Sequence, residues 1–186
     1  NTGMPIKSLI LSSPPLWHGQ QGGISPTPSP ANDIHSWLLE AGSLTQRLRS
    51  RYGNAFGVVL LQQRIGLPFA EERMALSLRP GAKAVIREVA LMAGQSPVIL
   101  ARSIIPHETV QYADPRLSRL GDQPLGEILF THPELGRSTL EWSRVSLRAP
   151  WEAQSVMGRR SLYTLSQSFP LLVAEFFLPE LLKEKA

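Results

Sequence analysis

Two apolar segments that read as β-strands each carry one charged residue where a core side chain is expected. Residues 85–89 (VIREV) contain Arg87, and residues 172–177 (LVAEFF) contain Glu175. Strand alternation places each charge level with the apolar residues two positions away on either side. A buried charge is costly unless it is paired or contacts a ligand. An inward arginine and an inward glutamate on one sheet therefore predict a small polar pocket inside an apolar body.

The two charges suggest a site for a small organic acid. Arg87 could grip a carboxylate through charged hydrogen bonds, and the alternative is that it pairs with Glu88 or another acid at a sheet edge. Glu175 has almost only apolar neighbours, so we expect burial to favour its protonated form and let it share or hold a proton near neutrality. The alternative for Glu175 is a structural salt bridge with an arginine across the sheet. The residues alone leave both alternatives open.

Other segments offer further groups for binding an anion. Residues 43–45 (SLT) and 123–126 (QPLG) both read as helix starts, where uncommitted backbone amides and the helix dipole attract negative charge. Every helix has such an end, so this signal is weak when taken alone. Residues 158–161 (GRRS) begin a predicted strand, and alternation allows at most one of Arg159 and Arg160 to face the pocket.

Several enzyme classes lack their motifs in this sequence. It has no phosphate-binding P-loop, no dinucleotide-binding glycine pattern, no nucleophile elbow and no H-E-x-x-H zinc motif. Cysteine is absent, which excludes disulfide scaffolds, cysteine zinc sites and thiol catalysis. The four histidines are scattered without ligand-like spacing, so we expect no metal site.

The chain is basic, with a net charge of +4 that comes mainly from 15 arginines against four lysines. This balance favours anionic partners without choosing between nucleic acid and a small acid. The densest cluster is Arg47, Arg49 and Arg51, and no aromatic-rich strand motif accompanies it. Helix geometry places Arg47 and Arg51 on one side, as expected for a solvated face. We therefore expect no nucleic-acid partner.

The pattern of elements predicts an α+β domain with a mostly antiparallel β-sheet flanked by helices. Helices are expected after Asp33 and after Ser43, the second ending near Gly53. A further helix is expected from Pro124, and one helical turn is expected within residues 67–76. Residues 93–97 link two long strands at hairpin distance. The expected strands are residues 56–65, 82–92, 98–105, 138–147, 159–166 and 171–178.

We expect a proline-rich arm or linker over residues 1–32, a single domain over residues 33–182 and a charged tail over residues 183–186. The first of these segments holds six of the 16 prolines and one charge. No apolar stretch approaches the roughly 18 residues needed to cross a membrane. The apolar patch at residues 9–11 is too brief for a secretory signal, and we expect a cytoplasmic protein. A pocket closed within one chain would make a monomer sufficient.

Taken in order, a set of segments over residues 35–180 resembles the chorismate pyruvate-lyase family, which makes 4-hydroxybenzoate and pyruvate from chorismate. No single segment is diagnostic, but the ordered set is fairly specific. The matching segments are residues 37–39 (WLL), 42–45 (GSLT), 86–89 (IREV), 101–106 (ARSIIP), 120–121 (LG), 124–126 (PLG), 129–130 (LF), 158–161 (GRRS) and 171–179 (LLVAEFFLP).

The resemblance implies a cofactor-free enzyme with an antiparallel sheet and an enclosed, internal ligand cavity. It implies that Arg87 grips the ring carboxylate and that the backbone amides of Leu44 and Leu125 help to hold it. Glu175 would face the hydroxyl end of the ring. Either Arg102 or Arg159 could meet the enolpyruvyl carboxylate. The product would supply the aromatic head group of a quinone such as ubiquinone or plastoquinone, and we expect marked product inhibition.

The alternative function is a non-catalytic sensor of small aromatic acids. A related fold serves as the effector-binding domain of some transcription regulators and holds small acids in a similar cavity. Such proteins normally carry a DNA-binding helix-turn-helix, and residues 1–32 are too proline-rich to form one. A sensor would take up 4-hydroxybenzoate and leave chorismate intact, which separates the two hypotheses.

Overall fold

A single antiparallel sheet of eight strands organises the part of the chain that the computed structural model describes, residues 3–19, 34–138, 140–152 and 156–183. The strand order is β1-β6-β7-β8-β4-β3-β2, and the short strand β5 pairs with β7. The strands are β1 (His18–Gly19), β2 (Phe56–Gly66), β3 (Ala84–Ala93), β4 (Ser96–Pro106), β5 (Gly136–Arg137), β6 (Glu141–Val145), β7 (Val156–Leu165) and β8 (Phe169–Phe177). This architecture confirms the predicted α+β class.

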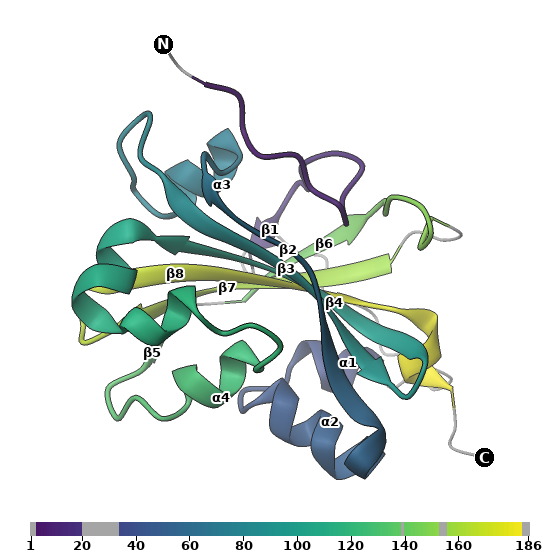
Figure 1. The fold of residues 1–186 in the computed structure, drawn as a ribbon. Helices are drawn as coiled ribbons and strands as arrows, with labels where there is room; N and C mark the ends of the chain where they lie inside the picture. Colours follow the sequence, from purple (N-terminus) through teal and green to yellow (C-terminus); the bar gives the residue numbers. More distant parts are fainter. Residues whose placement is uncertain (1–2, 20–33, 139, 153–155, 184–186) are drawn as a thin grey trace.

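Helices cover both faces of the sheet (Figure 1). Helices α1, α2 and α4 lie on one face, and α3 lies on the other together with the N-terminal segment. The helices are α1 (Ile34–Leu38), α2 (Leu44–Tyr52), α3 (Ala70–Ala75) and α4 (Leu125–Leu129), and short helical turns occupy Gly53–Ala55, Thr109–Ala113, Pro115–Ser118 and Pro179–Leu182. The sheet is therefore the middle layer, and strands with both faces covered need apolar residues in nearly every position.

The predicted central hairpin is present as β3 and β4, joined by a tight turn in which Gly94 has a φ of 61°. In its register Arg87 lies opposite Ser103, and Glu88 lies opposite Arg102. Successive strand residues point to opposite faces. The side chains of the neighbouring residues Arg87 and Glu88 therefore point to opposite faces of the sheet.

Helix α2 has the ends that its sequence predicts. Ser43 is the N-cap, and its hydroxyl accepts a hydrogen bond from the backbone N–H of Gln46 at 3.2 Å. Gly53 ends the helix with a φ of 56°, a conformation that favours glycine. Helix α4 begins one residue later than predicted, because Pro124 has extended backbone and acts as the N-cap residue. Asp33, the predicted cap of α1, lies outside the described residues.

The first part of the predicted arm packs against the domain instead of extending from it. Ile10 and Leu11 are buried, and they pack with Leu100 and Phe176 on the face of the sheet that α3 also covers. Strand β1 adds to the sheet by pairing with β6. A high proline content opposes regular helices and strands, but it does not prevent an apolar segment from being buried. The domain thus includes residues 3–19; residues 20–32 lie outside the described part.

At the other end, Lys183 of the predicted tail forms an ion pair with Glu180 at 2.7 Å, and residues 184–186 are outside the described part. None of the helices in the described ranges is long and apolar enough to cross a membrane.

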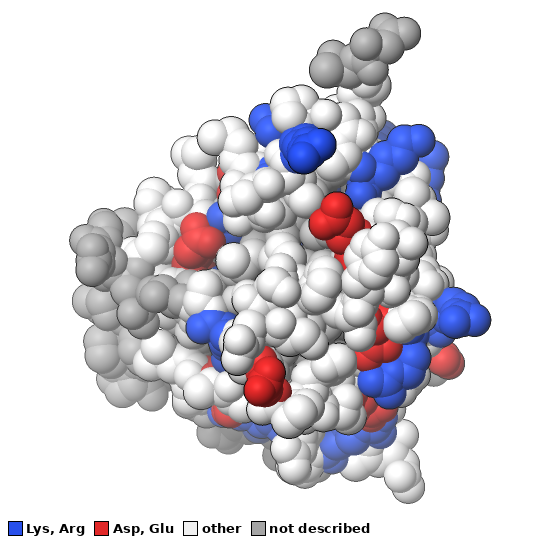
Figure 2. All heavy atoms as spheres, turned by 90° about the vertical axis from the view of Figure 1, so that its left-hand side faces the viewer, with Lys and Arg blue, Asp and Glu red and all other residues white. Residues whose placement is uncertain are grey.

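Basic side chains do not gather into one patch on the face of the molecule that Figure 2 shows. Figure 2 shows acidic and basic side chains interspersed on one face of the molecule. In the predicted arginine cluster, Arg47 forms an ion pair with Glu40 at 3.2 Å, and Arg49 forms one with Glu127. Arg51 donates to the backbone carbonyl of Lys183 at 3.0 Å. These three arginines therefore have partners within the chain.

Candidate active site

A cavity of about 60 Å³ lies against the sheet face that α2 and α4 cover. Its wall combines an apolar surface with a few charged and polar side chains, as small-ligand sites usually do. Its lining residues are Gly42, Leu44 and Thr45 at the start of α2, Pro124, Leu125, Gly126, Leu129 and Phe130 of α4 and its flanks, and Val58, Arg87, Val89, Leu91, Ala101, Ser103, Arg159, Tyr163, Val173 and Glu175 of the strands. The cavity brings together the four residues to which the resemblance assigns roles at the ring.

Arg87 is 2% exposed and lies in the cavity wall. Its Nη1 donates to the carbonyl of Gly121 at 2.7 Å, and its Nη2 donates to the carbonyl of Gln123 at 2.9 Å. Among the described residues no carboxylate forms an ion pair with it, so the alternative of pairing with Glu88 is not realised. Burial lowers the pKa of Arg87, because desolvation disfavours the charged guanidinium. A positive charge without an acidic partner thus faces the cavity.

Glu175 lies directly opposite Arg159 on the neighbouring strand. Its Oε1 accepts a hydrogen bond from Arg159 Nε at 3.0 Å, so the salt bridge across the sheet that we considered is present. Both side chains also line the cavity. Arg159 Nη1 donates to the carbonyls of Trp37, Leu38 and Glu40 at 3.3, 3.2 and 2.8 Å, which fixes its guanidinium against the end of α1. The pair therefore offers a held carboxylate at the cavity wall.

Arg102 does not reach the cavity, because Ala101 and Ser103 on either side of it face the cavity and alternation turns Arg102 to the other face. There its Nε and Nη2 each donate to Glu72 at 2.8 Å, and its Nη1 donates to Glu88 at 3.2 Å. Of the two arginines expected as alternatives for the second carboxylate, Arg159 lines the cavity. The structure removes Arg102 from that role.

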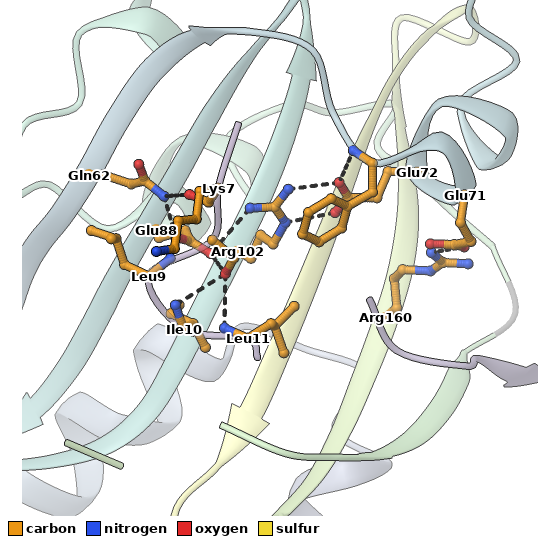
Figure 3. Close-up of polar contacts among 12 residues, drawn as sticks. Lys7, Leu9, Ile10, Leu11, Gln62, Glu71, Glu72, Glu88, Arg102 and Arg160 are labelled. Carbon is orange, nitrogen blue, oxygen red and sulfur yellow. Dashed lines mark hydrogen bonds and ion pairs between the residues drawn. The ribbon is translucent and has the colours of Figure 1, made fainter. Parts of the chain in front are cut away.

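The charges on the far face form a separate, structural cluster (Figure 3). Glu88 accepts hydrogen bonds from Ser8 Oγ at 2.5 Å, from the Leu9 backbone N–H at 2.7 Å and from Gln62 Nε2 at 2.5 Å. Arg160 also points to this face, where Glu71 contacts it. Of the neighbouring residues Arg159 and Arg160, it is therefore Arg159 that faces the cavity. The hydrogen bonds to Glu88 attach the N-terminal segment to the sheet.

Leu44 and Leu125 are the first residues of α2 and α4, and both line the cavity. Amides in the first turn of a helix have no partner within that helix. The two helix starts lie close together, since a Cβ added at Gly126 would come 3.0 Å from Thr45 Oγ1. Because Arg87 holds the carbonyls just before α4, the guanidinium and the two helix starts meet at one end of the cavity.

The chain is similar in sequence to proteins of a known family. The model of the chorismate lyase family matches residues 20–186 of the chain. The protein belongs to the chorismate lyase family. A probable chorismate pyruvate-lyase from Methylococcus capsulatus is 41% identical over 157 residues, which cover 80% of this chain and 96% of the relative. Another from Thiobacillus denitrificans is 36% identical over 159 residues, which cover 80% of this chain and 84% of the relative.

Solved structures share the fold of this chorismate lyase family member at low sequence identity. The effector domain of PhnF from Mycobacterium smegmatis has a TM-score of 0.56 at 13% identity, covering 76% of this chain and 91% of that domain. A GntR-family transcriptional regulator from Bacillus cereus has a TM-score of 0.55 at 9% identity, covering 72% of this chain and 98% of that one. These matches confirm the fold, and the family match confirms the resemblance drawn from the sequence.

Two further residues of this chorismate lyase family member lie at or near the site and were not predicted from its sequence. Tyr163 is buried and lines the cavity, and burial raises the pKa of its hydroxyl. Arg137 of β5 lies opposite Tyr163, with its guanidinium carbon 5.3 Å from the ring centroid. The two-residue period from Arg159 through Ser161 predicts the direction of Tyr163. A strand as short as β5 leaves no comparable signal for Arg137.

Proposed function

We propose that this protein removes pyruvate from chorismate and releases 4-hydroxybenzoate. The observation that carries the proposal is Arg87, a buried guanidinium without an acidic partner among the described residues, in the same cavity wall as Glu175. A buried charge of this kind needs a complementary ligand, and a carboxylate fits a guanidinium in two-point contact. Family membership and relatives named as probable chorismate pyruvate-lyases support the same reaction.

The protein has little covalent chemistry to perform in this reaction. Chorismate carries one carboxylate on its ring and a second on an enolpyruvyl ether. The ether C–O bond at the ring breaks, the neighbouring ring carbon loses its proton, and the enolpyruvyl fragment gains a proton to become pyruvate. The ring becomes aromatic, which makes the step strongly downhill. The protein has to hold a reactive conformer and stabilise the charge that moves onto the departing group.

The residues divide this work by their places in the cavity. Arg87 and the first-turn amides of Leu44 and Leu125 hold the ring carboxylate at one end. Glu175 accepts a hydrogen bond from the ring hydroxyl and assists proton movement there. Arg159, which Glu175 and the end of α1 hold in place, faces the departing carboxylate. These roles require no cofactor and no metal ion.

The same contacts hold the product. 4-Hydroxybenzoate keeps the ring carboxylate and the hydroxyl, so we propose that it leaves slowly and inhibits the enzyme. We further propose that the protein acts as a monomer. We also propose that the enzyme works in the cytoplasm and that its product becomes the aromatic head group of a quinone such as ubiquinone or plastoquinone.

The test is incubation of the pure protein with chorismate, without added metal, followed by chromatography of the products. We expect 4-hydroxybenzoate and pyruvate in equal amounts. Chorismate that stays intact while 4-hydroxybenzoate binds would contradict the proposal and favour the sensor. A different aromatic product, or an isomer of chorismate, would contradict the proposed bond cleavage.

A further inference from the structure

Arg137 lies on the cavity side of the sheet, just behind the wall that Arg159 and Tyr163 form. It belongs to β5, and its partner in the strand register is Tyr163. Its Nε donates to Ser161 Oγ at 3.1 Å, and Ser161 lies between Arg159 and Tyr163 on the same face of β7. Its Nη1 donates to the carbonyl of Glu40 at 3.1 Å, and Arg159 Nη1 donates to that same oxygen at 2.8 Å. The two guanidinium groups therefore converge.

One donor of Arg137 has nothing to bind. Its Nη2 is buried and has no hydrogen-bond partner among the described residues. Buried polar atoms in native proteins nearly always have a partner, and an exception points to a ligand, a water molecule or an ion at that place. Burial lowers the pKa of Arg137, but a guanidinium keeps its proton in proteins. The unpartnered group is therefore a positive donor.

The charges around the cavity do not balance. Arg87, Arg137 and Arg159 contribute three positive charges, and Glu175 contributes one negative charge. The carboxylate of Glu40 is paired with Arg47 at 3.2 Å, and Asp122, the acid that acts on Arg87 through space, is exposed to solvent. About two positive charges thus remain without a close acidic partner in the described part of the chain. That excess matches a dianion better than an acid with a single carboxylate.

We propose that Arg137 binds the enolpyruvyl carboxylate of the substrate, together with Arg159. This inference rests on the proposed function and adds a specificity residue to it. The ether of chorismate stands on the ring carbon next to the one that carries the hydroxyl, so its carboxylate lies at the Glu175 end of the cavity. 4-Hydroxybenzoate lacks that carboxylate. Arg137 therefore favours the substrate over the product and contributes little to product retention.

The experiment compares a diacid with a monoacid in three variants. Arg137→Gln removes the charge but keeps an amide donor for the Glu40 and Ala41 carbonyls that Arg137 now contacts. Arg137→Lys keeps the charge. Arg144→Gln makes the same change at an exposed arginine of β6 and serves as the control. For each we measure kcat/KM with chorismate and the Kd of 4-hydroxybenzoate and of 4-hydroxy-3-(carboxymethoxy)benzoate, an inert diacid.

For Arg137→Gln we expect kcat/KM and diacid affinity to fall by roughly 10- to 100-fold, the range for one charged hydrogen bond. The Kd of 4-hydroxybenzoate should stay within about 3-fold, which is well below that range. Arg137→Lys should show a smaller decrease in kcat/KM and in diacid affinity, and Arg144→Gln should have the wild-type values of both. Equal losses for monoacid and diacid would overturn the inference and assign Arg137 to holding the loop before α2; unchanged diacid affinity would also overturn it.

If Arg137→Gln does not fold, the charge-retaining Arg137→Lys provides the same comparison, and the inference then requires a selective loss of the diacid. The diacid measurement needs no turnover. A wild-type protein that binds the diacid through Arg137 but leaves chorismate intact would defeat the proposed function without defeating this inference.

Discussion

Arg87 and Glu88 are consecutive in β3, yet they lie on opposite faces of the sheet, one in the cavity wall and the other in a buried cluster with Arg102. One strand therefore lines the cavity on one side and attaches the N-terminal segment on the other. Arg159 and Arg160 repeat the arrangement on β7. Replacing Arg87 should therefore affect activity, whereas replacing its neighbour Glu88 should affect stability.

Replacing Arg87 should abolish most activity. Arg87→Ala removes the guanidinium proposed to hold the ring carboxylate, and we expect kcat/KM with chorismate to fall by about 10²- to 10³-fold, or roughly 3–4 kcal/mol. Arg87→Lys should recover little, because an ammonium cannot span the Gly121 and Gln123 carbonyls and a carboxylate together. Steady-state kinetics beside circular dichroism tests this; turnover within a few-fold of the wild type in a folded variant would remove the proposed role.

Replacing Glu88 should weaken the fold and leave the cavity intact. Glu88→Gln removes the charge that faces Arg102 and disturbs three hydrogen bonds that the N-terminal segment and Gln62 donate. We expect the free energy of unfolding to drop by about 3 kcal/mol, as for other broken buried pairs. Urea unfolding measures it. At a temperature where the variant is folded, an altered Kd for 4-hydroxybenzoate would show that the two faces are coupled.

Asp114 should make stability depend on pH in the acid range. Hydrogen bonds from Arg116, joined by His132 Nε2 at 2.8 Å, lower the pKa of Asp114 from its usual value of 3.8 to about 2. A depressed pKa stabilises the fold above about pH 4, and this contribution is lost as pH falls toward 2. Asp114→Asn should cost about 1 kcal/mol near pH 6, because solvent around the exposed Arg116 screens the pair.

Urea midpoints of the wild type and Asp114→Asn at several pH values decide this point. The difference between the two proteins should be largest above pH 4 and should shrink at pH 3. A difference that stays constant over this range would mean that the ionised carboxylate is not the source of the stability. Added salt should also reduce it, since Arg116 is exposed.

Added 4-hydroxybenzoate should slow the reaction. The product retains both groups that the cavity is proposed to bind. The rate of chorismate turnover should therefore fall as product accumulates, and it should fall sooner when product is present at the start. Glu175→Gln should weaken this inhibition, since it removes the charged acceptor for the ring hydroxyl. Curves that do not respond to added product would show that the cavity does not retain it.

Local signals made part of the fold predictable. The Ser43 cap and the Gly53 stop define α2, and the apolar runs joined near Gly94 define the central hairpin. Both depend on residues close together in the sequence. The inward direction of Arg87 and Glu175 followed from alternation, which needs only the strand that carries each residue.

Long-range contacts were the part that the sequence did not reveal. The attachment of the N-terminal segment to the sheet involves Glu88, which is 80 positions from Ser8. The choice between Arg102 and Arg159 required knowing which face of β4 the helices cover. Arg137 lies opposite Tyr163 on the two-residue strand β5, and a strand this short shows no sequence period. In each case the residue is positioned by a contact with a distant helix, strand or segment, and the sequence around the residue does not identify that contact.

Gly126 fixes one dimension of the cavity without contacting a ligand through a side chain. A Cβ at position 126 would lie 3.0 Å from Thr45 Oγ1, so a side chain there would press on the start of α2. We expect an alanine at this position to push the starts of α2 and α4 apart and to enlarge the cavity between them. The spacing of these two helix starts thus depends on the missing side chain of Gly126.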